Sequence, residues 1–120
     1  MGTSSMIGYV QEDGSVITTY CHFDGYVDGV GRELAERFST PEKAKSVASI
    51  GYLSGLQADL ELAIDDAVHT EDPVVYASSD VFLKCGDNHA GAEYLYLFDN
   101  LSWSVSTTEK RKNDRTWAWF

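Results

Sequence analysis

Between Met6 and Phe23 the chain reads MIGYVQEDGSVITTYCHF, a pattern typical of a β-hairpin. Two runs rich in β-branched and aromatic residues flank a turn that contains Asp13-Gly14. An Asp-Gly pair tolerates positive φ and favours a two-residue loop. Such a loop predicts a register in which Val10 faces Ile17, Gly8 faces Thr19 and Met6 faces Cys21.

Side chains along the second strand should alternate between the two faces of the ribbon. We expect three of them to point toward the core, namely Ile17, Cys21 and Phe23. We expect three others to point away from it, namely Tyr20, His22 and Asp24. The strand end therefore predicts an exposed group of a tyrosine, an imidazole and a carboxylate, followed by Tyr26.

Apolar residues recur at helical spacing in three later segments. The first helix is expected over residues 30–38. The second is expected after Thr40, which can cap it, with Pro41 at its first position and Gly51 placed to end it. The third is expected over residues 56–68, whose opposite face is acidic.

The remaining segments read as strands. Short strands are predicted at 74–77 and 81–85, and a second hairpin joins 93–98 to 102–106 around Asp99-Asn100. The order of elements predicts an α+β fold, with a mainly antiparallel sheet built from the N-terminal hairpin and the C-terminal strands. Two or three helices should pack on one face of that sheet.

Length and composition bound the class of protein. A chain of 120 residues with 43% hydrophobic and 23% charged residues is expected to form a single folded domain over residues 1–120. Residues 109–120 carry Trp117, Trp119 and Phe120, and form either an extended tail that clasps a partner or a final strand. No apolar run is long enough to cross a membrane, and no secretory signal is recognisable. We therefore expect a cytoplasmic protein with reduced cysteines.

The net charge of −10 favours some partners over others. Acidic residues number 19 against nine basic ones, and four of those nine lie within residues 109–120. Such an acidic body repels nucleic acid and attracts basic protein surfaces. Direct nucleic-acid binding is therefore not expected.

Two constellations could carry metal or nucleophilic chemistry. Zinc would need Cys21, His22, Cys85 and His89, but adjacent strand residues point to opposite sides, so Cys21 and His22 cannot readily reach one ion. An enzyme would use His22 with Asp24, or Cys85 with His89, as a base and its partner. We assign no catalytic residue, no metal and no cofactor from these patterns.

Glycines before the first helix suggest an alternative, a nucleotide site. Gly25, Gly29 and Gly31 precede Arg32, and a helix N-terminus suits an anion. The pattern lacks the third glycine of the dinucleotide fingerprint and the lysine of a P-loop. The alternative function is an oligomeric sponge for a small nucleotide signal, bound by Arg32, Tyr26 and the glycine turn.

Carboxylates follow one face of the predicted third helix and the loop after it: Asp59, Glu61, Asp65, Asp66, Glu71 and Asp72. Such a face is commonly a solvated one. It could also imitate the phosphates of DNA and occupy a basic groove on a partner.

Several of these residues together carry a resemblance. Gly8, the Glu12-Asp13-Gly14 turn, the run from Tyr20 to Tyr26, Val30-Gly31 and the Pro41-Glu42-Lys43 helix resemble a family of small proteins encoded by tailed bacteriophages. The resemblance is strongest over residues 6–57. It departs at Val27, where relatives tend to have proline, and at residues 51–57. It implies an accessory protein that acts in the cytoplasm of an infected bacterial host, and it implies no catalytic role.

The leading hypothesis is a stoichiometric binder or inhibitor of a host protein with a basic surface, serving counter-defence or host takeover. Its candidate binding residues are Tyr20, His22, Asp24, Tyr26, Arg32, Asp59, Asp65 and Asp66. Self-association into a homo-oligomer is compatible with either binding hypothesis.

Overall fold

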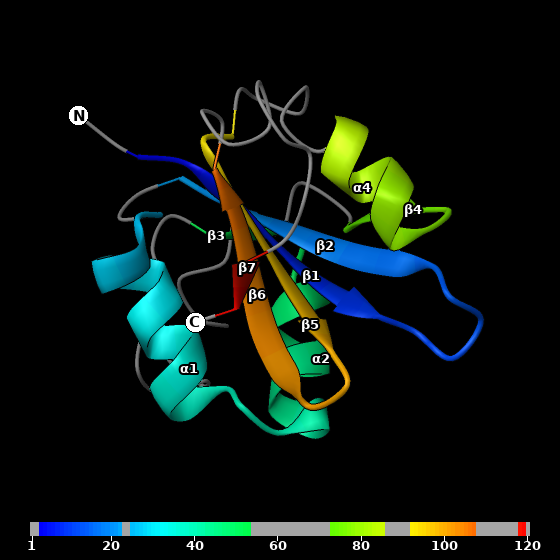
Figure 1. Cartoon of the computed structure of the whole chain (residues 1–120), viewed down its shortest axis with the longest axis horizontal. Helices are drawn as coiled ribbons and strands as arrows, with labels where there is room; N and C mark the ends of the chain where they lie inside the picture. The colour runs from blue at the N-terminus through cyan, green and yellow to red at the C-terminus, as the bar shows by residue number, and fades with distance from the viewer. Residues whose placement is uncertain (1–2, 23–24, 54–72, 86–91, 108–117, 120) are drawn as a thin grey trace.

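The computed structural model describes residues 3–22, 25–53, 73–85, 92–107 and 118–119. Figure 1 shows how its helices and strands are arranged. The elements are β1 (Ser5–Val10), β2 (Val16–Cys21), the short π-helix η1 (Val27–Gly31), α1 (Arg32–Arg37), α2 (Pro41–Ala48), β3 (Tyr52–Leu53), β4 (Val74–Tyr76), α4 (Ser79–Cys85), β5 (Tyr94–Asp99), β6 (Ser102–Thr107) and β7 (Ala118–Trp119).

The strands form one seven-stranded sheet in the order β3-β2-β1-β5-β6-β7, with β4 also paired to β2. The pairs β1–β2, β5–β6, β6–β7 and β2–β4 are antiparallel. Two pairs are parallel, β1 with β5 at the centre and β2 with β3 near the edge. The predicted α+β fold with a mainly antiparallel sheet is confirmed.

Helices α1 and α2 cover one face of the sheet, where most of the core lies (Figure 1). Val30, Leu34 and Phe38 come from the η1–α1 segment, and Ala44 and Val47 come from α2. They pack on sheet residues of that face: Ile7, Cys21, Leu53, Tyr96, Phe98, Trp103 and Val105. The helical spacing over 30–38 and the apolar face of the second helix are therefore confirmed.

Helix α2 begins as its sequence predicts. The Thr40 side chain accepts a hydrogen bond from the Lys43 backbone N–H at 3.4 Å, and Pro41 is the first helical residue. After the helix, Gly51 adopts φ +104°, a conformation that glycine reaches without steric cost. The predicted cap at Thr40 is confirmed. The helix itself ends at Ala48 with Ser49 as its C-cap, two residues before Gly51.

The first hairpin has a different register from the predicted one. Val10 pairs with Val16, Gly8 with Thr18 and Met6 with Tyr20, one residue away from the expected partners. The loop contains three residues, because Gly14 alone has positive φ (+88°) and its N–H donates to the Gln11 carbonyl at 2.9 Å. A type I turn followed by a left-handed glycine produces this three-residue loop.

Tyr20 is buried, at 6% exposure, and the prediction that it points away from the core is wrong. It lies on the face of the sheet opposite to Cys21, within a second apolar cluster that includes Met6, Leu95 and Leu97. Helix α4 supplies Phe82 to the same cluster. Both faces of this hairpin are covered. Side chains that alternate along β2 therefore point into one apolar cluster or the other, and not into a core on one side and solvent on the other.

Residues 81–85 form the end of α4, so the strand predicted there is wrong. A run of five residues is too short to distinguish helical from strand periodicity. The deciding signal is Ser78, whose hydroxyl accepts from the Val81 N–H at 3.2 Å and whose carbonyl accepts from the Phe82 N–H at 3.0 Å. By contrast, β4 (Val74–Tyr76) confirms the strand predicted at 74–77.

The second hairpin joins β5 to β6 as expected, with the turn one residue later than predicted. Asp99 pairs with Ser102, so the two loop residues are Asn100 and Leu101, with φ values of 51° and 66°. Tyr96 packs in the core under α1 and α2, and Leu95 and Leu97 pack in the opposite one. Successive side chains of β5 therefore alternate between the two cores.

Polar side chains from the sheet hold the helix ends. The Trp103 indole N–H donates to the Phe38 carbonyl at 3.0 Å, immediately after α1. The Thr19 hydroxyl donates to the Val47 carbonyl at 2.8 Å and accepts from the Gly51 N–H at 3.0 Å. These bonds satisfy backbone groups that helix ends leave without intrahelical partners. No helix among the described residues combines the length and the apolar character needed to cross a membrane.

Candidate functional site

The loop after β2 is held in place by Gly25. Its N–H donates to the Thr3 carbonyl at 2.7 Å, and its carbonyl accepts from the Tyr96 hydroxyl at 2.6 Å. A Cβ atom at Gly25 would lie 2.7 Å from the Thr3 carbonyl oxygen and 2.9 Å from the Ser4 carbonyl carbon. Only a glycine fits so close to a neighbouring backbone, and this contact fixes where Tyr26 begins the next segment.

Tyr20, His22 and Tyr52 form a ring cluster at the ends of β2 and β3. The Tyr20 hydroxyl and His22 Nδ1 are 3.1 Å apart, and their ring centroids are separated by 6.0 Å. The Tyr20 ring also lies 5.4 Å from that of Tyr52. Tyr20 is buried whereas His22 is exposed, so a core side chain orients an imidazole at the surface.

Tyr26, Val27 and Asp28 follow Gly25 and lie at the surface. Tyr26 is 42% exposed and Val27 is 36% exposed, which places both among the large apolar side chains most accessible to solvent. Asp28 is exposed as well and lies in the first turn of η1. We call His22, Tyr26, Val27 and Asp28 the strand-end surface. Asp24 belongs to this segment of the sequence but lies outside the described residues.

The thiols do not share a site with these groups. Cys21 is fully buried under the helices of one face, and Cys85 is exposed at the end of α4 on the other. Both are free cysteines. Within the described residues no three histidine, cysteine or acidic side chains are grouped as metal ligands. His89, the expected partner of Cys85, lies outside the described part of the chain.

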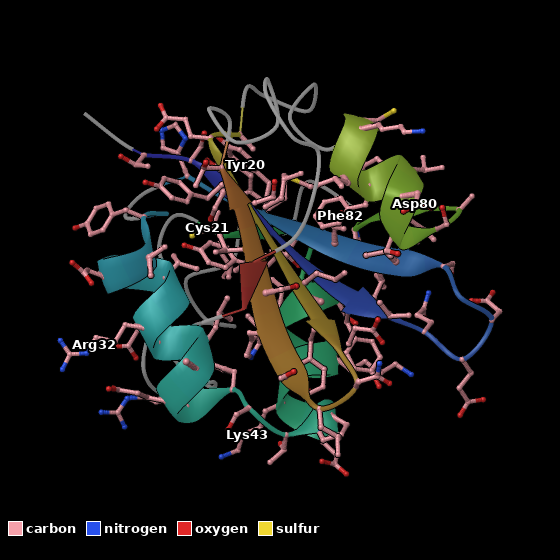
Figure 2. All side chains as sticks on the ribbon, in the orientation of Figure 1. Tyr20, Cys21, Arg32, Lys43, Asp80 and Phe82 are labelled. Carbon is pink, nitrogen blue, oxygen red and sulfur yellow. The ribbon has the colours of Figure 1, made fainter. Side chains whose placement is uncertain are left out.

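The glycines before α1 serve packing. A Cβ atom at Gly31 would lie 3.1 Å from the Tyr96 ring, and both Gly25 and Gly31 are buried. Arg32 points to solvent and pairs with Glu36 at 3.3 Å, with 68% of its own side chain exposed (Figure 2). The backbone N–H of Gly25 is already bonded, so it cannot serve as a phosphate donor in the nucleotide site considered above.

Besides Asp24, three more candidate residues, Asp59, Asp65 and Asp66, fall outside the described residues, as does the whole predicted helix 56–68. Of the candidates that are described, the strand end brings Tyr20, His22 and Tyr26 to one segment. Arg32 lies beyond η1, in α1. The last described strand, β7, pairs with β6, which places Ala118–Trp119 in the sheet.

A second surface feature lies at the other end of β1. Two hollows of about 360 and 280 Å³ share Tyr9 as a lining residue, and we call them together the Tyr9 groove. The first is lined by Gln11, Glu12, Asp13 and Lys45, and the second by Pro41, Phe98, Asp99, Asn100 and Leu101 among others. The groove thus lies between α2, the β1–β2 turn and the β5–β6 turn (Figure 1).

Sequence reasoning missed this groove. Tyr9 and Phe98 are partners in the parallel β1–β5 pair, and their strands bring two distant turns to the same edge of the sheet. The available signal was the polar residues at the ends of both strands, Gln11 to Asp13 and Asp99 to Asn100. Without knowing that β1 pairs with β5, nothing in the sequence places these two turns together.

The comparisons with known proteins add no relative to this picture. No protein-family model, no curated protein and no solved structure matches the chain.

Proposed function

We propose that this chain is a small acidic accessory protein of the phage type that binds a host protein stoichiometrically through the strand-end surface. The observation that carries the proposal is the anchoring of exposed recognition groups. His22 is oriented by the buried Tyr20 hydroxyl, and Tyr26 follows a glycine bonded on both sides. Groups held in one geometry lose little conformational entropy when a partner binds.

The chemistry of the surface suits protein recognition. Tyrosine side chains offer a large apolar contact together with a hydroxyl, and they are enriched where protein partners bind. An imidazole and the Asp28 carboxylate next to such rings add hydrogen-bonding groups. The net charge of −10 favours a basic partner and speeds its approach.

The test is capture from bacterial host lysate at an ionic strength of about 0.15 M. Tagged wild-type protein should retain a host protein in a one-to-one ratio, measured by native mass spectrometry. The double variant His22→Ala/Tyr26→Ala should lose it. Val81→Ala, an exposed apolar residue on α4, is the control and should capture normally.

If the double variant His22→Ala/Tyr26→Ala still captures the partner, the interface lies outside the strand-end surface. No stoichiometric partner at all would remove the binding function. Both substituted side chains lie at the surface, so we expect the fold of each variant to be intact. Circular dichroism of each variant checks this expectation.

A further inference from the structure

We infer that the Tyr9 groove receives an arginine side chain of the partner protein. The inference rests on the proposed binding function but concerns a surface at the opposite end of β1, roughly 17 Å from the strand end at about 3.3 Å per residue. The Tyr9 groove lies at the carboxyl ends of the parallel strands β1 and β5.

The floor of the groove is aromatic and firmly supported. The Tyr9 and Phe98 rings are stacked, with centroids 5.9 Å apart and planes inclined by 10°. Phe98 in turn meets Trp103 edge-on at 5.2 Å and is only 3% exposed. The Tyr9 ring, supported in this way, presents a π surface of fixed orientation, and guanidinium groups bind favourably over such surfaces.

The rim of the groove is predominantly negative. Glu12 and Asp13 line one hollow and Asp99 lines the other, whereas Lys45 is the single basic residue that lines either. Hydrogen bonds from the Ser15 hydroxyl and backbone N–H lower the pKa of Asp13, so its carboxylate remains charged. Three carboxylates against one ammonium leave an excess of two negative charges, which favours a cationic occupant.

The volume of the groove and its hydrogen-bonding groups further limit which side chain can bind. Volumes of about 360 and 280 Å³ lie close to the lower limit of about 300 Å³ for ligand pockets, so each hollow suits one long side chain better than a large molecule. The Gln11 and Asn100 side chains add amide oxygens that can accept from a planar guanidinium. Arginine presents five N–H donors in one plane, which lysine does not.

A substitution at Lys45 tests whether the bound group is positively or negatively charged. Its ammonium repels a bound guanidinium, so Lys45→Gln should tighten binding of a cationic occupant by about threefold. An anionic occupant would respond in the opposite way, because it would lose its attractive charge. The same substitution therefore separates the two classes of ligand.

The probe is the peptide acetyl-Gly-Gly-Arg-Gly-Gly-amide, added to the full chain and followed by NMR. The Tyr9 ring and the Gln11 and Asn100 side-chain amides should shift, and raising ionic strength from about 0.05 to 0.3 M should weaken binding. The matched peptide with citrulline, which is similar in shape but uncharged, should bind roughly tenfold more weakly. Equal binding of the two peptides, or no shift at these groups, would overturn the inference.

Variants of the groove complete the test. Tyr9→Leu should weaken the arginine peptide by about fivefold, whereas Tyr9→Phe should retain binding. Asp99→Asn should weaken it by about threefold, and Glu42→Gln, an exposed carboxylate of α2 outside the groove, should leave it unchanged. Lys45→Gln should tighten the same peptide, and unchanged or weaker binding of the peptide by this variant would overturn the inference.

The two proposals can fail separately. If His22→Ala/Tyr26→Ala abolishes lysate capture while Asp99→Asn and Tyr9→Leu do not affect it and the arginine peptide does not bind, the binding function stands and the groove inference fails. If the arginine peptide binds as expected but no host protein is captured, the proposed function fails and the groove remains a guanidinium site.

Discussion

The Tyr96 hydroxyl donates a 2.6 Å hydrogen bond to the carbonyl of Gly25, 71 positions earlier in the chain. The same ring lies against Gly31, so one buried side chain holds both ends of the segment between β2 and α1. The position of the strand-end surface therefore depends on a residue of β5.

Replacing Tyr96 with phenylalanine should cost about 1–2 kcal/mol of unfolding free energy, because the Gly25 carbonyl loses a buried donor. Urea denaturation followed by circular dichroism measures the loss. The ring remains in Tyr96→Phe, so the packing against Gly31 serves as its own control. An unchanged midpoint would show that water replaces the lost bond.

Alkaline pH should destabilise the protein through the same residue. Burial, with a smaller contribution from the neighbouring Tyr94, raises the pKa of Tyr96 above its ordinary value of 10.0. The unfolded chain releases this proton above pH 10 whereas the folded chain keeps it, so stability is complete below pH 10 and falls above it. Denaturant midpoints measured on both sides of pH 10 should fall more steeply for the wild type than for Tyr96→Phe. Parallel curves would contradict this assignment.

Thr19→Val should destabilise the fold by about 2 kcal/mol, since the shape is kept but two backbone groups, the Val47 carbonyl and the Gly51 N–H, lose their partner. Thr18→Val is the matched control. The Thr18 hydroxyl donates one bond, to the Val74 carbonyl, and its loss should cost about 1 kcal/mol. Thermal unfolding of the pair measures the difference, and equal losses would argue against the double role of Thr19.

Gly25→Ala should cost about 1–3 kcal/mol and should also weaken partner capture, because the new methyl group would displace the backbone at Thr3 and Ser4. Gly14→Ala provides the comparison. That glycine has open space around it but a φ of +88°, so alanine there should cost about 1 kcal/mol of strain without affecting capture. Capture by Gly25→Ala at wild-type levels would separate the strand-end surface from the glycine anchor.

Leu101→Gly should stabilise the chain by about 0.5–1 kcal/mol. Leu101 adopts φ 66° in the two-residue turn and is 69% exposed, so it bears the left-handed strain without contributing a buried side chain. Leu101→Ala shortens the side chain but keeps the strain, and its melting temperature should stay near that of the wild type. If both variants behave alike, the gain comes from removing the leucine and not from the backbone.

The local patterns of this sequence predict local structure well. Thr40-Pro41 defines the start of α2, the spacing of Val30, Leu34 and Phe38 defines a buried helical face, and alternation separates Leu95 from Tyr96. Each of these features is set by periodicity or by capping within a few residues. Such short-range patterns are visible in one sequence without any knowledge of the tertiary structure.

Two predictions of local structure were wrong because the competing conformations differ little in free energy. A three-residue loop with one left-handed glycine competes with a two-residue loop at Asp13-Gly14, and choosing between them moves every partner in the hairpin by one position. The short apolar run in α4 fits a strand or a helix, and the Ser78 cap favours the helix.

What the sequence by itself determined is a set of local features: the start of α2, the buried face of the η1–α1 segment, and the two strands of the second hairpin. Only the tertiary structure decided that Tyr20 is buried in the second apolar cluster, that Tyr96 holds Gly25, and that Tyr9 and Phe98 stack beneath a common groove. The physical reason is that these relationships depend on which distant strands pair and on both faces of the sheet being covered. Pairing of β1 with β5 joins residues nearly 90 positions apart, and no periodicity within either strand specifies it.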